Sequence, residues 1–193
     1  MFRCYTILSM MTDTYIWLER LSSLHRSQMR KAANAEGMQL VQIEILQYLA
    51  LSNRYSNTAQ ALSEYLGQTK GSISQSLKCL EERNLVKRKP CNEDGRLVRL
   101  YLTTKSKEVI KRIEKRLTPD INDDEKTIAA FKSILTTWQR QKDQKGFGQC
   151  RSCRFNVDNG DGSFLCGLTG EPLKKSETTL ICREHEFSEG MAR

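Results

Sequence analysis

Four cysteines near the end of the chain have the spacing of metal ligands. Cys150, Cys153, Cys166 and Cys182 form a C-x2-C-x12-C-x15-C array, and His185 follows shortly after. Two thiolates separated by two residues can bind the same metal because the turn between them aims both sulfurs to one side. The array therefore predicts a metal site made of these four cysteines, with His185 as a possible alternative ligand.

The spacing leaves the kind of metal centre open. Zinc ribbons usually repeat the C-x2-C pair, whereas here zinc would use Cys150, Cys153, Cys182 and either Cys166 or His185. A 4Fe–4S cluster needs one thiolate for each iron, contributed from separate loops. The spacing is similar to that of high-potential iron–sulfur proteins and of small iron–sulfur subunits of certain glycyl-radical enzymes. Four phenylalanines near the cysteines would shield a cluster or fill a zinc module: Phe147, Phe155, Phe164 and Phe187. The alternatives are a 4Fe–4S cluster, zinc or no metal.

The cysteine count and the composition indicate a globular protein of a reducing compartment. Hydrophobic residues make up 38% of the 193 residues and charged residues 28%, and no apolar run approaches the roughly 20 residues that a membrane span needs. An odd number of cysteines, seven, fits a reducing cytoplasm better than a disulfide framework. We therefore expect a cytoplasmic protein without a membrane partner.

Positive charge is concentrated before the cysteine array. Residues 1–145 carry 25 Lys and Arg against 16 Asp and Glu, whereas residues 146–193 carry 6 against 7. This asymmetry favours a polyanionic partner for the first part of the chain. We divide the chain into a domain at residues 1–142 and a linker with a cysteine-rich module at residues 143–193.

Hydrophobic periodicity predicts mainly helices with one β-hairpin before the cysteine array. Helices are expected from Thr12 to Gly37, over 38–51, from Thr58 to Gly67, from Thr69 to about residue 82, over 104–117 and from the acidic turn at 120–125 to Trp138. Strands are expected over 85–89 and 97–102, with a polar turn between them. Residues 139–149 are polar and contain two glycines, which predicts a linker. The fold class is therefore mainly α with a small β wing: a winged helix-turn-helix with long flanking dimerisation helices and a small cysteine-rich module.

The helix that Thr69 begins has the composition of a DNA-recognition helix. Ile73, Leu77 and Leu80 are its buried positions, so the polar residues face mostly outward. Gln75 and the serines can bond base edges in a major groove, while lysines meet phosphate or guanine. Gly71 allows close approach of the backbone. The candidate DNA-binding residues are Thr69, Lys70, Gly71, Ser72, Ser74, Gln75 and Lys78 on this helix, and Lys87, Arg88, Lys89, Asp94 and Arg96 on the wing. Arg83 and Arg99 add to the positive charge of the wing arms.

Residues 38–107 resemble the MarR family of bacterial regulators. The resemblance rests on residues 38–46, on the helix-turn-helix stretch 61–74, and on Asp94-Gly95-Arg96 ahead of Leu102-Thr103, where the family has its D-x-R wing tip. It implies that Arg96 reads a minor groove and that Asp94 braces it. It also implies a two-fold dimer on a pseudo-palindromic operator. Ser106 departs from the family, which usually has glycine there.

These observations predict a dimeric, sequence-specific transcription regulator of double-stranded DNA, which is modulated by a C-terminal iron–sulfur cluster acting as a redox or iron sensor. Loss of the cluster would change how the C-terminal segment braces the dimer. One alternative is the same regulator with a structural zinc and a small-molecule effector. Another is an electron-transfer or enzyme-accessory subunit that does not bind DNA specifically. The sequence contains no catalytic constellation, so we expect a non-enzyme.

Overall fold

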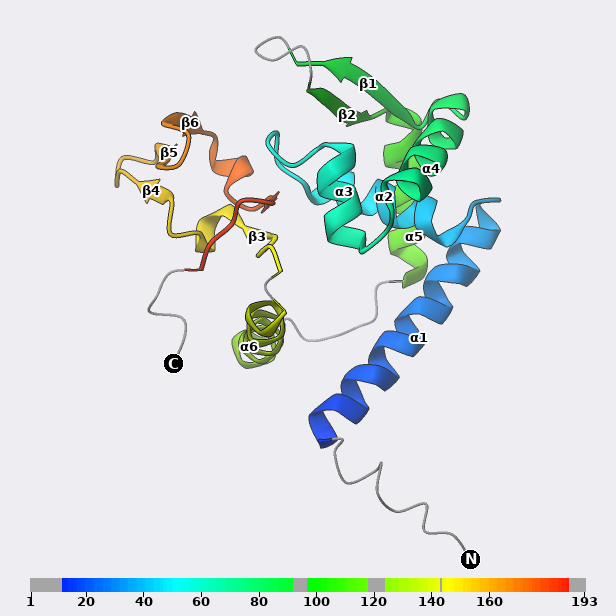
Figure 1. Ribbon diagram of the computed structural model, residues 1–193, viewed down its shortest axis with the longest axis horizontal. Helices are drawn as coiled ribbons and strands as arrows, with labels where there is room; N and C mark the ends of the chain where they lie inside the picture. Colours follow the sequence, from blue (N-terminus) through cyan, green and yellow to red (C-terminus); the bar gives the residue numbers. More distant parts are fainter. Residues whose placement is uncertain (1–11, 92–96, 118–123, 143, 188–193) are drawn as a thin grey trace, which may run out of the picture.

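A computed structural model describes residues 12–91, 97–117, 124–142 and 144–187 (Figure 1). The helical part contains α1 (Asp13–Ala35), α2 (Leu40–Leu51), α3 (Ala59–Leu66), α4 (Lys70–Glu82), α5 (Thr104–Leu117) and α6 (Glu125–Gln141). Between α4 and α5, β1 (Val86–Pro90) and β2 (Val98–Leu102) pair as an antiparallel ribbon in which Val86 lies opposite Leu102. No helix in the part of the chain that the structure describes is both long and apolar enough to cross a bilayer.

The helix boundaries follow from their caps. Thr12, Thr58 and Thr69 each accept a hydrogen bond from a backbone N–H of the first turn of α1, α3 and α4. Gly67 ends α3 in the left-handed conformation, at φ 61°, which a residue without a side chain adopts without strain. The helix-turn-helix predicted from these residues is confirmed, as is the β wing.

One hydrophobic core holds the helix-turn-helix in place. Fully buried side chains come from every element around it: Ile43, Ile45, Leu46 and Tyr48 of α2, Leu62 of α3, Ile73, Leu77 and Leu80 of α4, Leu85 before β1, and Ile113 of α5. Tyr65 of α3 is 41% exposed and lies outside this buried set. Its ring instead lies at the edge of the core, 4.6 Å from the Tyr48 ring centroid and 5.2 Å from that of Phe147.

Polar contacts fix the end of α1 against α4 and α5. The Glu36 carboxylate accepts hydrogen bonds from Arg112, at 2.7 Å, and Arg116, at 2.9 Å. Those bonds hold the pKa of Glu36 below its usual range, with Arg112 contributing most. Arg83 donates to the backbone oxygens of Gly37 and Glu36. At the start of α5, Ser106 is fully buried and its hydroxyl donates to the Thr103 oxygen, so the serine at this position serves the helix start.

The cysteine-bearing residues form a separate module of short strands. β3 (Gly148–Gln149) pairs with β7 (Ile181–Cys182), and β4 (Asn156–Asp158), β5 (Phe164–Cys166) and β6 (Glu171–Leu173) form a three-stranded antiparallel sheet. The 3-10 turns η2 (Cys150–Ser152) and η3 (Lys175–Glu177) connect them. Figure 1 shows this module beside the loop that precedes α3, with α1 on the far side of the helical part.

The linker predicted at residues 139–149 is wrong at both ends of that range. Residues 139–141 are the last residues of α6, and Gly148–Gln149 is a strand. Phe147 packs against Tyr48 and Tyr65. A Cβ atom on Gly148 would lie 2.6 Å from the His185 ring, and one on Gly146 would lie 2.5 Å from the His185 backbone oxygen. The two glycines therefore allow close packing rather than flexibility.

Candidate nucleic-acid interface and cysteine site

The outer face of α4 carries the residues predicted to contact DNA. Lys70, Gly71, Ser74, Gln75 and Lys78 are exposed, whereas Ser72 is half-buried. Exposed Thr69 uses its hydroxyl oxygen as the helix cap by accepting from the Ser72 N–H at 3.2 Å. Because Ile73, Leu77 and Leu80 anchor the opposite face in the core, these polar side chains have a fixed orientation toward solvent.

The wing supplies further positive charge, but part of it is already paired. Lys87, Arg88 and Lys89 of β1 are exposed. The Arg88 guanidinium donates to Glu81 at 2.7 Å, and the Lys89 ammonium lies 5.6 Å from the ring centroid of Tyr101. Asp94 and Arg96, the predicted wing-tip pair, lie outside the described residues.

Arg83 and Arg99, which the sequence places among the positive charges of the wing arms, each donate a hydrogen bond within the chain. Arg83 binds the backbone at the end of α1, as described above, and Arg99 donates to the side-chain oxygen of Asn57 at 3.5 Å. The exposed cations that remain for a phosphate backbone on the described part of this face are Lys70, Lys78, Lys87 and Lys89.

All four cysteines of the array line one small cavity. Cys150 begins η2 and Cys153 follows it, Cys166 ends β5 and Cys182 ends β7, so the four thiols come from one turn and two strand ends. The cavity has a volume of about 20 Å³. Apolar and polar neighbours complete its wall: Phe155, Leu168, Leu173, Asn53, Tyr55, Asn156 and Glu184. Of the four phenylalanines predicted to shield the site, Phe155 alone is among the lining residues.

The thiols lie close enough to influence one another. Burial, followed by the proximity of the thiols of Cys153, Cys182 and Cys166, raises the pKa of Cys150 to about 11. The Cys153 N–H donates to the Cys150 oxygen at 2.9 Å, which forms the tight turn expected for a C-x2-C pair. Within the described ranges, however, no group of three or more His, Cys, Asp or Glu side chains has the arrangement of a metal site. The four thiols of the described residues therefore line one cavity, but they are not arranged as the ligands of a metal ion.

His185 does not join the cysteines. It is 3% exposed, and its Nε2 atom shares a hydrogen bond with the Ser152 hydroxyl at 3.0 Å. Its ring packs edge-on against Phe187, with 4.5 Å between centroids, and burial lowers its pKa. Its ring faces Gly146 and Gly148 rather than the cavity. The donor set that the structure brings together is therefore four thiols.

Two residues of the cavity wall come from the helical part and were missed by the sequence reasoning. Asn53 and Tyr55 lie in the α2–α3 loop, which we define as residues 52–58. They are separated from the array by almost half of the chain, and neither residue type is a usual thiolate-site marker. No local sequence signal could have identified them.

Comparisons with known proteins identify the helical part. Residues 36–97 match the sequence model of the MarR family. No curated protein matches the chain. Among solved structures, CouR from Rhodococcus jostii RHA1, crystallised with p-coumaroyl-CoA, is 18% identical with a TM-score of 0.54, covering 70% of this chain and 94% of that one.

Two further structures show the same fold. Wild-type MarR from E. coli is 16% identical with a TM-score of 0.51, covering 66% of this chain and 98% of that one. The transcriptional regulator BldR from Sulfolobus solfataricus is 18% identical with a TM-score of 0.51, and the match covers 66% of this chain and 99% of that one. The helical part of the chain therefore has the winged-helix fold of these structures, with a match to the MarR family over residues 36–97.

Proposed function

We propose that the chain is a sequence-specific, DNA-binding transcription regulator that acts as a homodimer. The observation that carries this proposal is the outer face of α4, where Lys70, Ser74, Gln75 and Lys78 project from a helix fixed in the core of a helix-turn-helix. Such a helix fits a major groove, where Gln75 can bond adenine through both ends of its amide. The MarR family match over residues 36–97 and the shared fold with BldR, a transcriptional regulator, support the same function.

The flanking helices support the homodimer. α1 exposes Ile16, Trp17, Leu21 and Leu24, with Trp17 72% exposed. α6 exposes Phe131, Leu135 and Trp138. Exposed apolar faces of this length on two helices are typical of a subunit interface. A two-fold dimer would present two copies of α4 to half-sites about one helical turn apart.

We further propose that the four cysteines bind a metal centre, a 4Fe–4S cluster that acts as a redox or iron sensor. Four thiols from three segments around one cavity match the number of ligands that such a cluster needs. A structural zinc is the second candidate, and the cavity volume favours it, because about 20 Å³ is room for roughly one water-sized sphere. Either centre would draw the thiolates inward and cross-link η2, β5 and β7.

Selection of duplexes from a random pool tests the DNA-binding function. The full chain should enrich a pseudo-palindromic sequence, and Gln75→Ala should relax the preference at one position in each half-site, at a cost of about 1–3 kcal/mol in discrimination. Lys132→Ala, on exposed α6 away from the wing, is the matched control and should select the wild-type sequence. Failure of the wild-type chain to enrich any sequence would favour an accessory subunit instead.

Metal and sulfide analysis of protein purified without oxygen tests the cysteine site. About four irons and an equal amount of sulfide per chain would establish the cluster, whereas one zinc per chain and a colourless sample would establish a structural zinc site. Protein that holds neither iron nor zinc after reconstitution with both would contradict metal binding.

A further inference from the structure

We propose that the cysteine site is shared between the two parts of the chain, and that metal binding there controls the helix-turn-helix of the same subunit through the α2–α3 loop. This inference rests on the proposed metal binding and DNA binding. It places the coupling inside one subunit, whereas the sequence suggested that the module acts by bracing the dimer.

The α2–α3 loop is bonded directly to the strand that carries Cys182. The Asn53 N–H donates to the Ile181 oxygen at 2.9 Å, and Ser52 forms a parallel β-bridge with Ile181. Asn53 is 4% exposed and Ser56 is fully buried, although both are polar. A buried polar loop on a cavity wall is held by its hydrogen bonds, so its position depends on the strand that supplies them.

Asn53 also lines the cavity beside the proposed ligand Cys182. Its side-chain oxygen accepts from the Tyr55 N–H at 3.1 Å and from the Ser56 hydroxyl at 2.8 Å, which leaves its amide nitrogen to donate. A donor to a ligating sulfur is a common way for surrounding residues to orient a metal ligand. The helical part therefore places a buried side-chain amide on the wall of the cysteine cavity.

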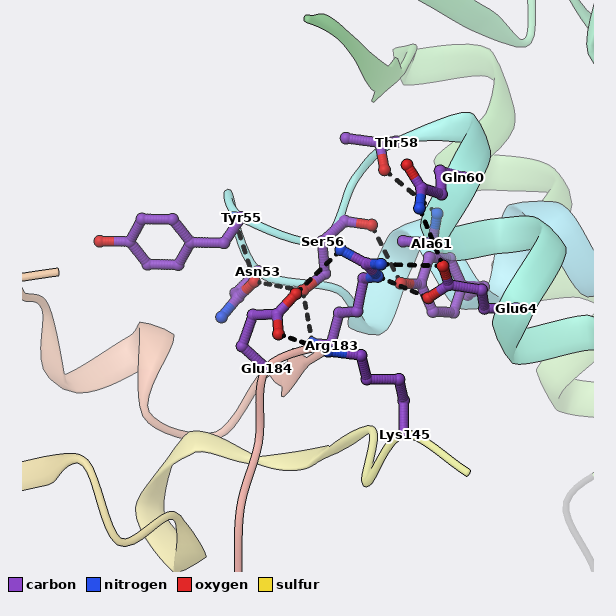
Figure 2. A network of polar contacts seen from close by, with 11 residues as sticks. Asn53, Tyr55, Ser56, Thr58, Gln60, Ala61, Glu64, Lys145, Arg183 and Glu184 are labelled. Carbon is purple, nitrogen blue, oxygen red and sulfur yellow. Dashed lines mark hydrogen bonds and ion pairs between the residues drawn. The ribbon is translucent and has the colours of Figure 1, made fainter. Parts of the chain in front are cut away.

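The residue after Cys182 joins the module to α3. The Arg183 N–H donates to the Ser56 hydroxyl oxygen at 2.8 Å. Its guanidinium donates two hydrogen bonds to the Glu64 carboxylate, at 2.5 and 2.8 Å (Figure 2). These bonds hold the pKa of Glu64 below its usual range. With side chains only 24% and 32% exposed, this bidentate pair is better shielded from solvent than an ordinary surface ion pair.

The same loop is bonded to the wing. The Leu100 N–H donates to the Asn57 oxygen at 2.8 Å, and the Asn57 side-chain amide donates to the Leu100 oxygen at 3.1 Å. Leu100 is the buried centre of β2. A displacement of β7 would therefore reach the wing through the loop and Asn57, and it would reach α3 directly through the Arg183–Glu64 pair. The wing and α3 are the two elements that set the position of α4 on DNA.

A second group of contacts fixes the other edge of the module to the loop. Arg54 donates to the Pro172 oxygen at 2.8 Å and pairs with Glu171 at 3.2 Å. The Tyr55 hydroxyl donates to Glu171 at 2.5 Å. The module thus holds the loop from two sides, and its own internal order depends on the cysteine site because it is too small to have a large core.

Metal binding would bias this arrangement toward one state. Drawing Cys182 toward the other thiolates fixes β7 and hence Arg183, whereas loss of the metal releases both. Since Arg183 bonds the loop and α3, the two states would hold the helix-turn-helix differently. Coupling between two sites in proteins is typically about 5- to 150-fold in affinity, and we expect operator affinity to differ by that factor between the metal-loaded and metal-stripped chain.

The test compares operator affinity of loaded and stripped protein for the full-length wild type and three variants. Loading uses zinc under reducing conditions and, in parallel, ferrous iron with sulfide under nitrogen. Arg183→Met and Glu64→Gln each break the pair between the module and α3. Arg154→Met is the matched control, because Arg154 pairs with Glu186 at 2.7 Å within the module.

The Arg183→Met and Glu64→Gln variants should still bind metal and operator, but the ratio of operator affinities between the metal-loaded and metal-stripped protein should fall toward one. The Arg154→Met variant should keep the wild-type ratio of affinities. Loss of metal from Glu64→Gln, whose change lies on α3, would also support a shared site. An unchanged ratio in metal-binding Arg183→Met and Glu64→Gln, or a wild-type ratio of one, would overturn the inference. Absence of metal or of operator binding in the wild type would instead contradict the proposed function.

Discussion

Replacing Lys70 and Lys78 of α4 by alanine should weaken operator binding and flatten its salt dependence. Both lysines are exposed, and no ion pair engages either of them within the described residues. Neither side chain contributes to the core, since Ile73, Leu77 and Leu80 anchor the opposite face of α4. The change should therefore reduce affinity for DNA without loss of folding stability.

The magnitude follows from the number of exposed lysines. Lys70, Lys78, Lys87 and Lys89 give up to about eight phosphate contacts in a dimer, and a slope of log K against log salt near −7. Each lysine removed takes away two contacts and should change the slope by about 2, so the double variant should have a slope near −3.6. Between 50 and 200 mM salt, each single variant should lose about tenfold less affinity than the wild type does.

Titration of a fluorescent operator duplex at several salt concentrations measures this slope. Lys132→Ala on α6 removes the same charge at the opposite end of the molecule from the wing and should leave the slope unchanged (Figure 1). Equal slopes for the wild type and for Lys70→Ala and Lys78→Ala would show that α4 does not face the phosphate backbone. That result would refute the placement of the recognition helix.

Three further substitutions test separate contacts. Gly71→Ala should raise stability by up to about 1 kcal/mol in chemical unfolding, because the nearest atom to the new Cβ is 4.0 Å away, yet lower operator affinity if DNA covers this face. Gly148→Ala should lower the free energy of unfolding by about 1–3 kcal/mol, because its Cβ would overlap the His185 ring. Hydrogen exchange should then increase in residues 148–185, and unchanged exchange would argue against the packed module. Tyr48→Phe removes a buried 2.9 Å hydrogen bond to the Ser56 backbone oxygen and should lower the free energy of unfolding by about 1 kcal/mol in chemical unfolding. An unchanged free energy of unfolding would show that this hydrogen bond does not hold the loop.

Most of the helical part could be predicted from the sequence because its signals are local. The caps at Thr58 and Thr69, the stop at Gly67 and the spacing of Ile73, Leu77 and Leu80 each act within a few residues. The place of Tyr65 could not be predicted from local signals, because its ring packs against Phe147 from a distant part of the chain.

The relation between the two parts could not be predicted in the same way. Arg183 and Glu64 are 119 residues apart, and an arginine or a glutamate at either position has the pattern of an ordinary exposed residue. Residues 146–149 contain two glycines, which is typical of a linker, but the glycines are there because His185 occupies the space of a side chain. The spacing of the cysteines predicts a metal site, and all four cysteines line one cavity, but within the described residues they are not arranged as the ligands of a metal ion. The spacing did not show that Asn53 and Tyr55 complete its wall.

The most direct test of the coupling between metal binding and DNA binding is the affinity of the full chain for one selected operator. This affinity is measured with metal bound at the cysteine site and again after a chelator has removed the metal under nitrogen. Coupling between the cysteine site and the helix-turn-helix predicts two dissociation constants that differ by about 5-fold or more, with the original value restored on reloading. Identical dissociation constants for protein that demonstrably gains and loses its metal would contradict it.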